Sequence, residues 1–171
     1  MIPLSMGVLL FKFGSKENYL TISIVASLLF IASISWIIYK KNKGDYSDYS
    51  ISDRKQRYSF YHFAIPLIFI TSFLFNVLDQ PRHLIISFIF GGILMLISYL
   101  SNFFIKSSLH TSLNIYLAFT VFMLHNGLGV FIFCFAMAIA YSRVILKKHT
   151  FPEIVSGFII GALTGIGLYF Y

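Results

Sequence analysis

Three residues with the chemistry of phosphate handling lie close together in the stretch SRVILKKHTFPEIVSG, residues 142–157. His149 follows Arg143 by six residues and precedes Glu153 by four. A site that handles phosphate needs positive charge, hydrogen-bond donors at helix N-termini, and either a metal ion or a nucleophile. The stretch offers an arginine, a histidine and a predicted helix start, so phosphoryl transfer is one chemistry that it favours.

Carboxylates that could hold a metal ion are scarce on the side of the protein where this stretch is expected. They are Asp45, Asp48, Asp53 and Glu153. The sequence contains no Asp-x-x-x-Asp motif of the kind that binds Mg²⁺ in membrane prenyl transferases. We therefore expect no metal and no other cofactor, and phosphoryl transfer through a nucleophilic histidine fits better.

Ordinary structural roles are alternatives for two of these residues. Arg143 would end a helix at a membrane interface, where a cation suits the helix dipole and snorkels to water. Thr150 and Glu153 form the Thr-x-x-Glu pattern of a capping box, and Pro152 suits a first helical turn. Helix initiation therefore explains Glu153 without catalysis.

The pattern Ser-Arg-x5-His-x3-acid, followed by Gly157, resembles the third signature of the type-2 phosphatidic acid phosphatase superfamily, the membrane relatives of the vanadium haloperoxidases. The usual acid in that signature is Asp, and Glu153 is a longer substitute. The resemblance implies that His149 is the nucleophile, that Glu153 orients its imidazole, and that Arg143 binds phosphoryl oxygens.

The other two signatures of that family are altered in this sequence. Ser107-Ser108-Leu109-His110 stands where the family has Pro-Ser-Gly-His, which implies that His110 is the general acid and Ser108 a phosphate ligand, with Lys106 adding charge. The first signature, Lys-x6-Arg-Pro, is absent. Arg54 and Arg57, three residues apart, are its possible functional replacement. The alternative is that both arginines only mark the end of a membrane helix, where long cationic side chains extend to the water interface. The resemblance covers about residues 50–171.

The elements that must position these residues are transmembrane helices. Of 171 residues, 58% are hydrophobic and 11% charged, and runs long enough to cross a bilayer core recur along the chain. We predict an all-α, polytopic six-helix bundle that forms one integral membrane domain, residues 1–171, with its phosphatase-like core at about 50–171. The expected helices are 19–39, 59–78, 83–105, 109–125, 127–142 and 153–171. Residues 1–18 are interpreted as an interfacial segment.

Further features predict how these helices pack. A tight turn at His125 joins the fourth and fifth helices, both of which are short for full spans, so we expect their other ends to be recessed into the protein. Gly157, Gly161 and Gly165 follow one another at four-residue intervals, a pattern that lets helices approach closely in lipid.

Six spans place alternate connections on one face of the membrane, and this face is strongly cationic. It holds ten of the 13 basic residues: Lys40, Lys41, Lys43, Arg54, Lys55, Arg57, Lys106, Arg143, Lys147 and Lys148. The net charge of +7 points here to anionic lipid or phosphate rather than nucleic acid. The alternative is that these basic residues serve only to orient the protein in the membrane. The positive-inside rule places this face in the cytoplasm, most simply at a prokaryotic inner membrane.

The sequence therefore predicts a membrane-embedded, metal-independent phosphatase that hydrolyses a lipid phosphate or polyprenyl (di)phosphate through a phosphohistidine. Phosphatidic acid, phosphatidylglycerol phosphate and polyprenyl diphosphate all fit as substrates within the membrane. The alternative is a non-catalytic membrane protein of the same fold that binds anionic lipid, which Leu109 and the missing first signature favour. The glycine row suits packing within one chain or between chains, so the oligomeric state stays open.

Overall fold

The computed structural model describes residues 16–49, 51 and 53–171, with side chains from residue 21 onward. The first fifteen residues of the interfacial segment expected at 1–18 lie outside this part of the chain. The described residues form six helices and no strand, which confirms the predicted all-α bundle. The helices are α2 (Lys16–Asn42), α3 (Arg54–Val77), α4 (Arg82–Ser101), α5 (Leu109–Phe122), α6 (Asn126–Ile145) and α7 (Phe151–Tyr169).

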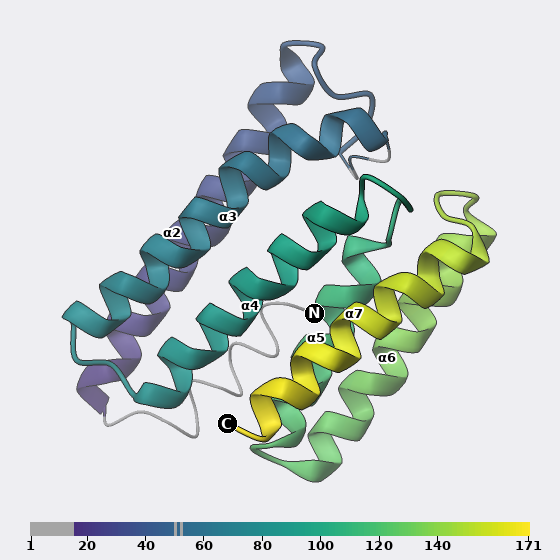
Figure 1. The fold of residues 1–171 in the computed structure, drawn as a ribbon. Helices are drawn as coiled ribbons and strands as arrows, with labels where there is room; N and C mark the ends of the chain where they lie inside the picture. Colours follow the sequence, from purple (N-terminus) through teal and green to yellow (C-terminus); the bar gives the residue numbers. More distant parts are fainter. Residues whose placement is uncertain (1–15, 50, 52) are drawn as a thin grey trace.

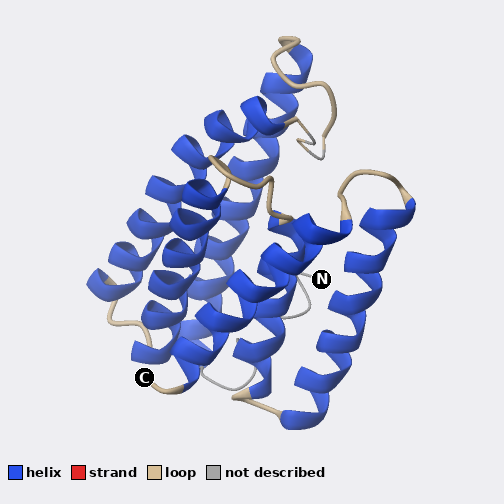
Figure 2. Cartoon of the chain, turned by 45° about the vertical axis from the view of Figure 1, so that its right-hand side comes forward, coloured by secondary structure: helices blue, strands red, loops and turns tan. Residues whose placement is uncertain are grey.

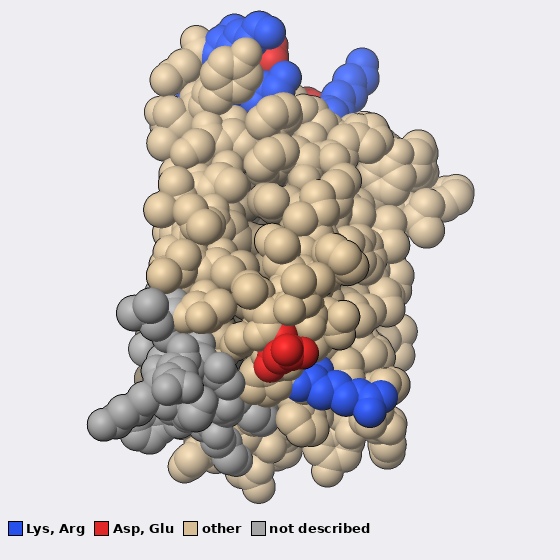
Figure 3. Space-filling view, turned by 90° about the vertical axis from the view of Figure 1, so that its left-hand side faces the viewer, with Lys and Arg blue, Asp and Glu red and all other residues tan. Residues whose placement is uncertain are grey.

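All of these helices except α5 are long and apolar enough to cross a membrane. The protein is an integral membrane protein, and its charged groups in Figure 3 lie toward the two ends of a largely uncharged surface. α5, with 14 residues, is short as expected. The same expectation was wrong for α6, which has 20 residues because its helix begins at Asn126 and continues through Arg143 to Ile145.

Side-chain caps fix where several helices begin. The Asp53 carboxylate accepts from the backbone N–H groups of Lys55 and Gln56 and starts α3. Ser108 Oγ accepts from the Thr111 N–H at the start of α5, and His125 Nδ1 accepts from the Leu128 N–H at the start of α6. These bonds satisfy donors that a helix leaves open in its first turn. Two of the capped starts, α3 and α5, carry candidate site residues.

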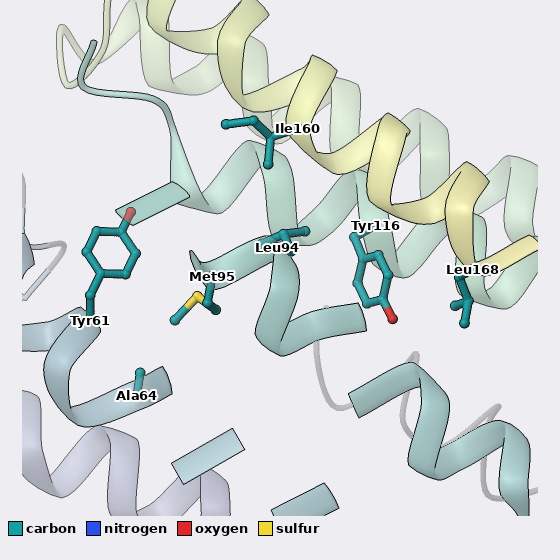
Figure 4. Packing of buried hydrophobic residues seen from close by; sticks show 7 residues of the cluster. All are labelled: Tyr61, Ala64, Leu94, Met95, Tyr116, Ile160 and Leu168. Atoms are coloured by element: carbon teal, nitrogen blue, oxygen red, sulfur yellow. The ribbon is translucent and has the colours of Figure 1, made fainter. Parts of the chain in front are cut away.

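The helices pack in an order that buries α5 (Figure 1). α2 packs on α3, α3 on α4, and α4 on α7, while α5 lies against α4, α6 and α7. The core cluster in Figure 4 joins α3, α4, α5 and α7; its members are Tyr61, Ala64, Leu94, Met95, Tyr116, Ile160 and Leu168. This core fixes α3, which carries Arg57, relative to the helices that carry the histidines.

The glycine row of α7 packs against α5. A Cβ atom at Gly157 would lie 2.5 Å from the Ser108 carbonyl oxygen, and one at Gly165 would lie 2.5 Å from Phe119 Cβ. Gly161 is equally close to Ser112. The prediction that these glycines serve close helix packing is confirmed, and the contact joins the two helices whose N-terminal ends carry the histidine motifs.

The α2–α3, α4–α5 and α6–α7 connections gather at one end of the bundle (Figure 2). Lys148 Nζ lies 3.0 Å from Asp48 Oδ2, and Arg57 Nη1 lies 2.6 Å from the Ser107 carbonyl oxygen. The first pair joins the α6–α7 connection to the α2–α3 connection. The second joins the start of α3 to the α4–α5 connection. The predicted common face is therefore confirmed.

Candidate active site

His149 lies at the end of the α6–α7 loop and points inward. The backbone N–H groups of Lys148 and His149 both donate to the Arg143 carbonyl oxygen, at 3.0 and 3.2 Å, so the loop wraps around the end of α6. Lys147 completes the reversal with a left-handed φ of 52°, a conformation that is uncommon outside glycine. The His149 residue is only 7% exposed as a result.

Glu153 contacts both the imidazole and the start of α7. Its Oε2 atom lies 2.8 Å from His149 Nδ1 and accepts from the Thr150 N–H at 3.1 Å. The capping box predicted for α7 is thus present together with the histidine contact. An ionised Glu153 requires a proton on Nδ1, which leaves the lone pair on Nε2. The Glu153 carboxylate therefore makes both the helix-capping contact and the contact with His149.

The environment of His149 keeps its ring neutral at pH 7. Burial, followed by the Arg57 charge, lowers the pKa of His149 to about 4 from an ordinary value of 6.5, while the Glu153 hydrogen bond and charge act in the opposite direction. A neutral ring with Nδ1 protonated has an available nitrogen at Nε2, which is the form that nucleophilic attack needs.

Arg57 supplies the cation that faces this nitrogen. Its Nη2 atom lies 3.0 Å from His149 Nε2, while Nη1 donates to the Ser107 carbonyl at 2.6 Å and Nε to the Ile51 carbonyl at 3.0 Å. Three contacts therefore orient a guanidinium that is 4% exposed. Arg54 has a different position: its Nε donates to the Asn102 carbonyl, and its own carbonyl accepts from Asn102 Nδ2 at 3.2 Å.

The start of α5 lies directly beside the start of α7. The Ser108 N–H donates to the Glu153 carbonyl at 3.0 Å. Ser108 Oγ caps α5 by accepting from the Thr111 N–H, and it also accepts from Thr111 Oγ1 at 2.9 Å. Ser108 is fully buried. His110, in the first turn of α5, interacts electrostatically with Arg143, Arg57 and His149. The two predicted histidines thus interact with each other, and both interact with Arg57.

Arg143 and Lys106 are the remaining predicted site residues. Arg143 is half-buried, its backbone anchors the α6–α7 loop, and its charge interacts with those of Arg57 and His110. Lys106 Nζ donates to the Lys148 carbonyl at 3.3 Å. A cavity of ≈ 270 Å³ lies here, lined by Lys106, Val144, Lys147, Lys148, His149, Thr150 and Glu153. Positive charge surrounds the neutral His149 ring, an arrangement suited to a phosphoryl group.

Several contributors were not found from the sequence. The carbonyls of Ile51 and Ser107 hold Arg57, and Asp48 pairs with Lys148. Only Asp48 had a sequence signal, as one of the few acids in a basic linker. Within the described residues, no three His, Cys, Asp or Glu side chains gather in a way that could hold a metal ion.

Comparison with known families now adds to this geometry. Residues 101–171 match the family model of the PAP2 superfamily. The PAP2 match includes both histidine motifs, from Lys106 to His110 and from Arg143 to Glu153, and it leaves out α3 with Arg57. No curated protein and no solved structure gives a match to the chain. The PAP2 match supports a phosphatase-type lipid function at the coarse level.

Proposed function

We propose that the protein is a metal-independent phosphatase that hydrolyses a lipid phosphate or polyprenyl (di)phosphate through a phosphohistidine on His149. The observation that carries the proposal is the chain of contacts from Glu153 through His149 to Arg57. It offers a neutral imidazole whose Nε2 lone pair faces a buried guanidinium. The other proposed phosphate ligands are Arg143, Ser108 and Lys106; Arg54, bound to Asn102, would have to leave that contact to join them.

The first step transfers the phosphoryl group to the protein. His149 Nε2 attacks phosphorus, the bond from phosphorus to the leaving oxygen breaks, and His110 gives that oxygen a proton. Burial and the Arg143 charge lower the pKa of His110 to about 4, so this step needs His110 to be protonated first, which the negative charge of the bound substrate favours. Arg57 would pass its N–H donors from Nε2 to the phosphoryl oxygens as the substrate enters. Arg57 and Arg143 stabilise the charge that these oxygens carry in the transition state.

The second step releases inorganic phosphate. Water attacks phosphorus, the phosphorus–Nε2 bond breaks, and His110, now neutral, takes the proton of the water. Glu153 holds Nδ1 throughout and stabilises the ring while it carries extra positive charge. The three basic connections lie at one end of the helices, so a lipid could present its phosphate there with its chains still in the bilayer. By charge bias this end faces the cytoplasm, at a prokaryotic inner membrane.

Hydrolysis by the purified protein tests this function. Phosphatidic acid, phosphatidylglycerol phosphate and a polyprenyl diphosphate would be supplied in detergent micelles with EDTA, and released phosphate measured. We expect phosphate release from at least one substrate, inhibition by vanadate, and loss of release in His149→Ala. His83→Ala, which changes a histidine at the start of α4, is the matched control and keeps activity. Undiminished release by His149→Ala would overturn the site assignment.

A lipid-binding protein without catalysis is the second candidate function. Two observations favour it: Leu109 stands where the family signature has glycine, and Arg57 already occupies the Nε2 face of His149. This candidate predicts that vesicles containing anionic lipid bind the protein while no member of the substrate panel releases phosphate. The same preparations of wild type and His149→Ala distinguish the two functions.

A further inference from the structure

The α2–α3 linker contacts the loop of the nucleophile through one ion pair in the described part of the chain. Asp48 Oδ2 lies 3.0 Å from Lys148 Nζ, and both side chains are partly exposed. Other linker contacts are local: Lys40 pairs with Asp45 at 2.8 Å, and Lys41 donates to the Ser47 carbonyl. Asp48 is thus a linker carboxylate that reaches across to the residue directly before His149.

Lys148 belongs to the same cavity as the nucleophile. Lys106 and Lys147 also line this cavity, and Lys106 Nζ donates to the Lys148 carbonyl. Asp48 interacts electrostatically with Arg57 and His110 as well, so its carboxylate is within range of the inner cations. A carboxylate of the protein itself therefore pairs with one of the lysines that line the cavity of His149.

We propose that Lys148, with Lys106 and Lys147, forms a second anion subsite for a further phosphoryl group of the substrate, and that Asp48 occupies this subsite in the substrate-free protein. The proposal rests on the function proposed above, in which Arg57 and Arg143 bind the phosphoryl group under attack. It names the substrate class as a lipid diphosphate rather than a monophosphate.

Charge and geometry explain why a diphosphate would displace Asp48. A phosphoryl group presents more charge and more acceptor oxygens to a lysine cluster than one carboxylate does. The side chains of Lys148 and Asp48 are 38% and 28% exposed, and such partly exposed ion pairs contribute little free energy in water, so a phosphoryl group can displace Asp48. A monophosphate bound at His149 has no second group for this position and leaves Asp48 in place.

Farnesyl diphosphate and farnesyl monophosphate, which share one lipid chain, test the subsite in detergent micelles. Asp48→Asn removes the internal competitor, so we expect KM for the diphosphate to fall about two- to fivefold, the range of a partly exposed ion pair. KM for the monophosphate stays unchanged. Lys148→Gln raises KM for the diphosphate alone and abolishes the effect of Asp48→Asn in the double variant. Asp45→Asn, which breaks the other linker ion pair, is the matched control and changes neither KM.

Three outcomes would overturn the subsite: equal changes for both substrates, an effect of Asp48→Asn that persists in Lys148→Gln, or the same effect in Asp45→Asn. His149-dependent hydrolysis with any of these results leaves the proposed function standing. If no protein hydrolyses either substrate, calorimetry with methylenediphosphonate and methylphosphonate gives the answer. We expect tighter binding of methylenediphosphonate to wild type and loss of this preference in Lys148→Gln; equal binding of the two probes overturns the subsite.

Discussion

The two sides of the candidate site are held together in different ways. On the α5–α7 side, backbone meets backbone: the Ser108 N–H donates to the Glu153 carbonyl, and Gly157 allows this approach. On the α3 side, long side chains cross the gap, with Arg57 bound to the Ser107 carbonyl and His149, and Asp48 paired with Lys148. The first side lies inside the PAP2 match and the second precedes it.

This difference shows which positions need a fixed sequence pattern. Two histidines that act on opposite sides of one phosphorus atom need a fixed mutual geometry, which close backbone packing provides. An arginine can deliver its charge from several backbone positions because its side chain is long and its planar fork is oriented by carbonyl acceptors. The absent Lys-x6-Arg-Pro signature therefore does not mean that its cation is absent, since Arg57 faces His149 Nε2.

Replacing Arg57 should have the largest effect on the α3 side. Arg57→Ala removes the donor that lies 3.0 Å from His149 Nε2, and we expect kcat to fall about 10²- to 10³-fold, as for other groups that stabilise transition-state charge. Arg54→Ala is the matched control, because Arg54 also donates to a backbone carbonyl, but its partner is Asn102 rather than a residue of the site. Its kcat should change by less than about threefold, within the range of ordinary surface effects.

Phosphate release by folded protein, checked by size-exclusion elution and Tm, measures this prediction. Arg57→Lys should recover part of the activity by restoring charge without the planar fork. Equal losses in Arg54→Ala and Arg57→Ala would show that the basic cluster supports the helix border rather than the site.

On the α5–α7 side, Gly157→Ala should lower stability and activity together. The added Cβ would lie 2.5 Å from the Ser108 carbonyl oxygen, so α5 and α7 must separate at the site. We expect a loss of about 1–3 kcal/mol in the free energy of unfolding. Gly91→Ala is the control: a Cβ atom at this buried helical glycine would lie 3.9 Å from Tyr116 Cε1, an ordinary van der Waals distance, so the change is tolerated or stabilising.

Thermal unfolding in detergent with a matched activity assay measures both variants. An unchanged Tm for Gly157→Ala would show that the close α5–α7 approach is unnecessary.

The smallest expected effect is a shift of the acid side of the pH–activity profile. Because the pKa of His149 is lowered to about 4, its Nε2 lone pair is present at neutral pH and is lost as the pH falls toward 4. The same group contributes stability above its ordinary value of 6.5, and this is lost as the pH falls through about 4. Activity and stability should therefore both decline on the acid side.

Variants should move this acid limb in opposite directions. Removing the Arg57 charge raises the pKa of His149 and moves the limb to higher pH, whereas Glu153→Gln removes a cause that raises this pKa and moves the limb to lower pH. The pH dependence of kcat/KM reports these values for the free protein. A shift in the same direction for both variants would contradict the assigned neighbours of His149.

The sequence was sufficient where local spacing decides the structure. His149 and Glu153 are four residues apart around a helix start, so their contact follows from one helical turn. The glycine row likewise predicted a close helix contact. Because successive membrane spans run in opposite directions, the sequence also predicted that the three basic connections lie on one face.

Tertiary packing decided the rest. Arg54 and Arg57 both lie in the first turn of α3, and the sequence does not distinguish them. The carbonyl of Asn102 binds Arg54 and the carbonyl of Ser107 binds Arg57, and these contacts determine that Arg57 faces His149. The length of α6 was underestimated because Arg143 looks like a helix border, although its backbone continues the helix. The Asp48–Lys148 pair joins residues 100 positions apart, and no local pattern predicts it.

Covalent labelling of His149 tests the central claim most directly. The purified protein would be mixed with a polyprenyl diphosphate carrying ³²P on its terminal phosphoryl group, quenched in alkali, and digested for mass spectrometry. We expect acid-labile, alkali-stable phosphate on the peptide that contains His149, present in His83→Ala and absent in His149→Ala. Sustained phosphate release with the label on another residue, or with undiminished turnover in His149→Ala, would contradict it.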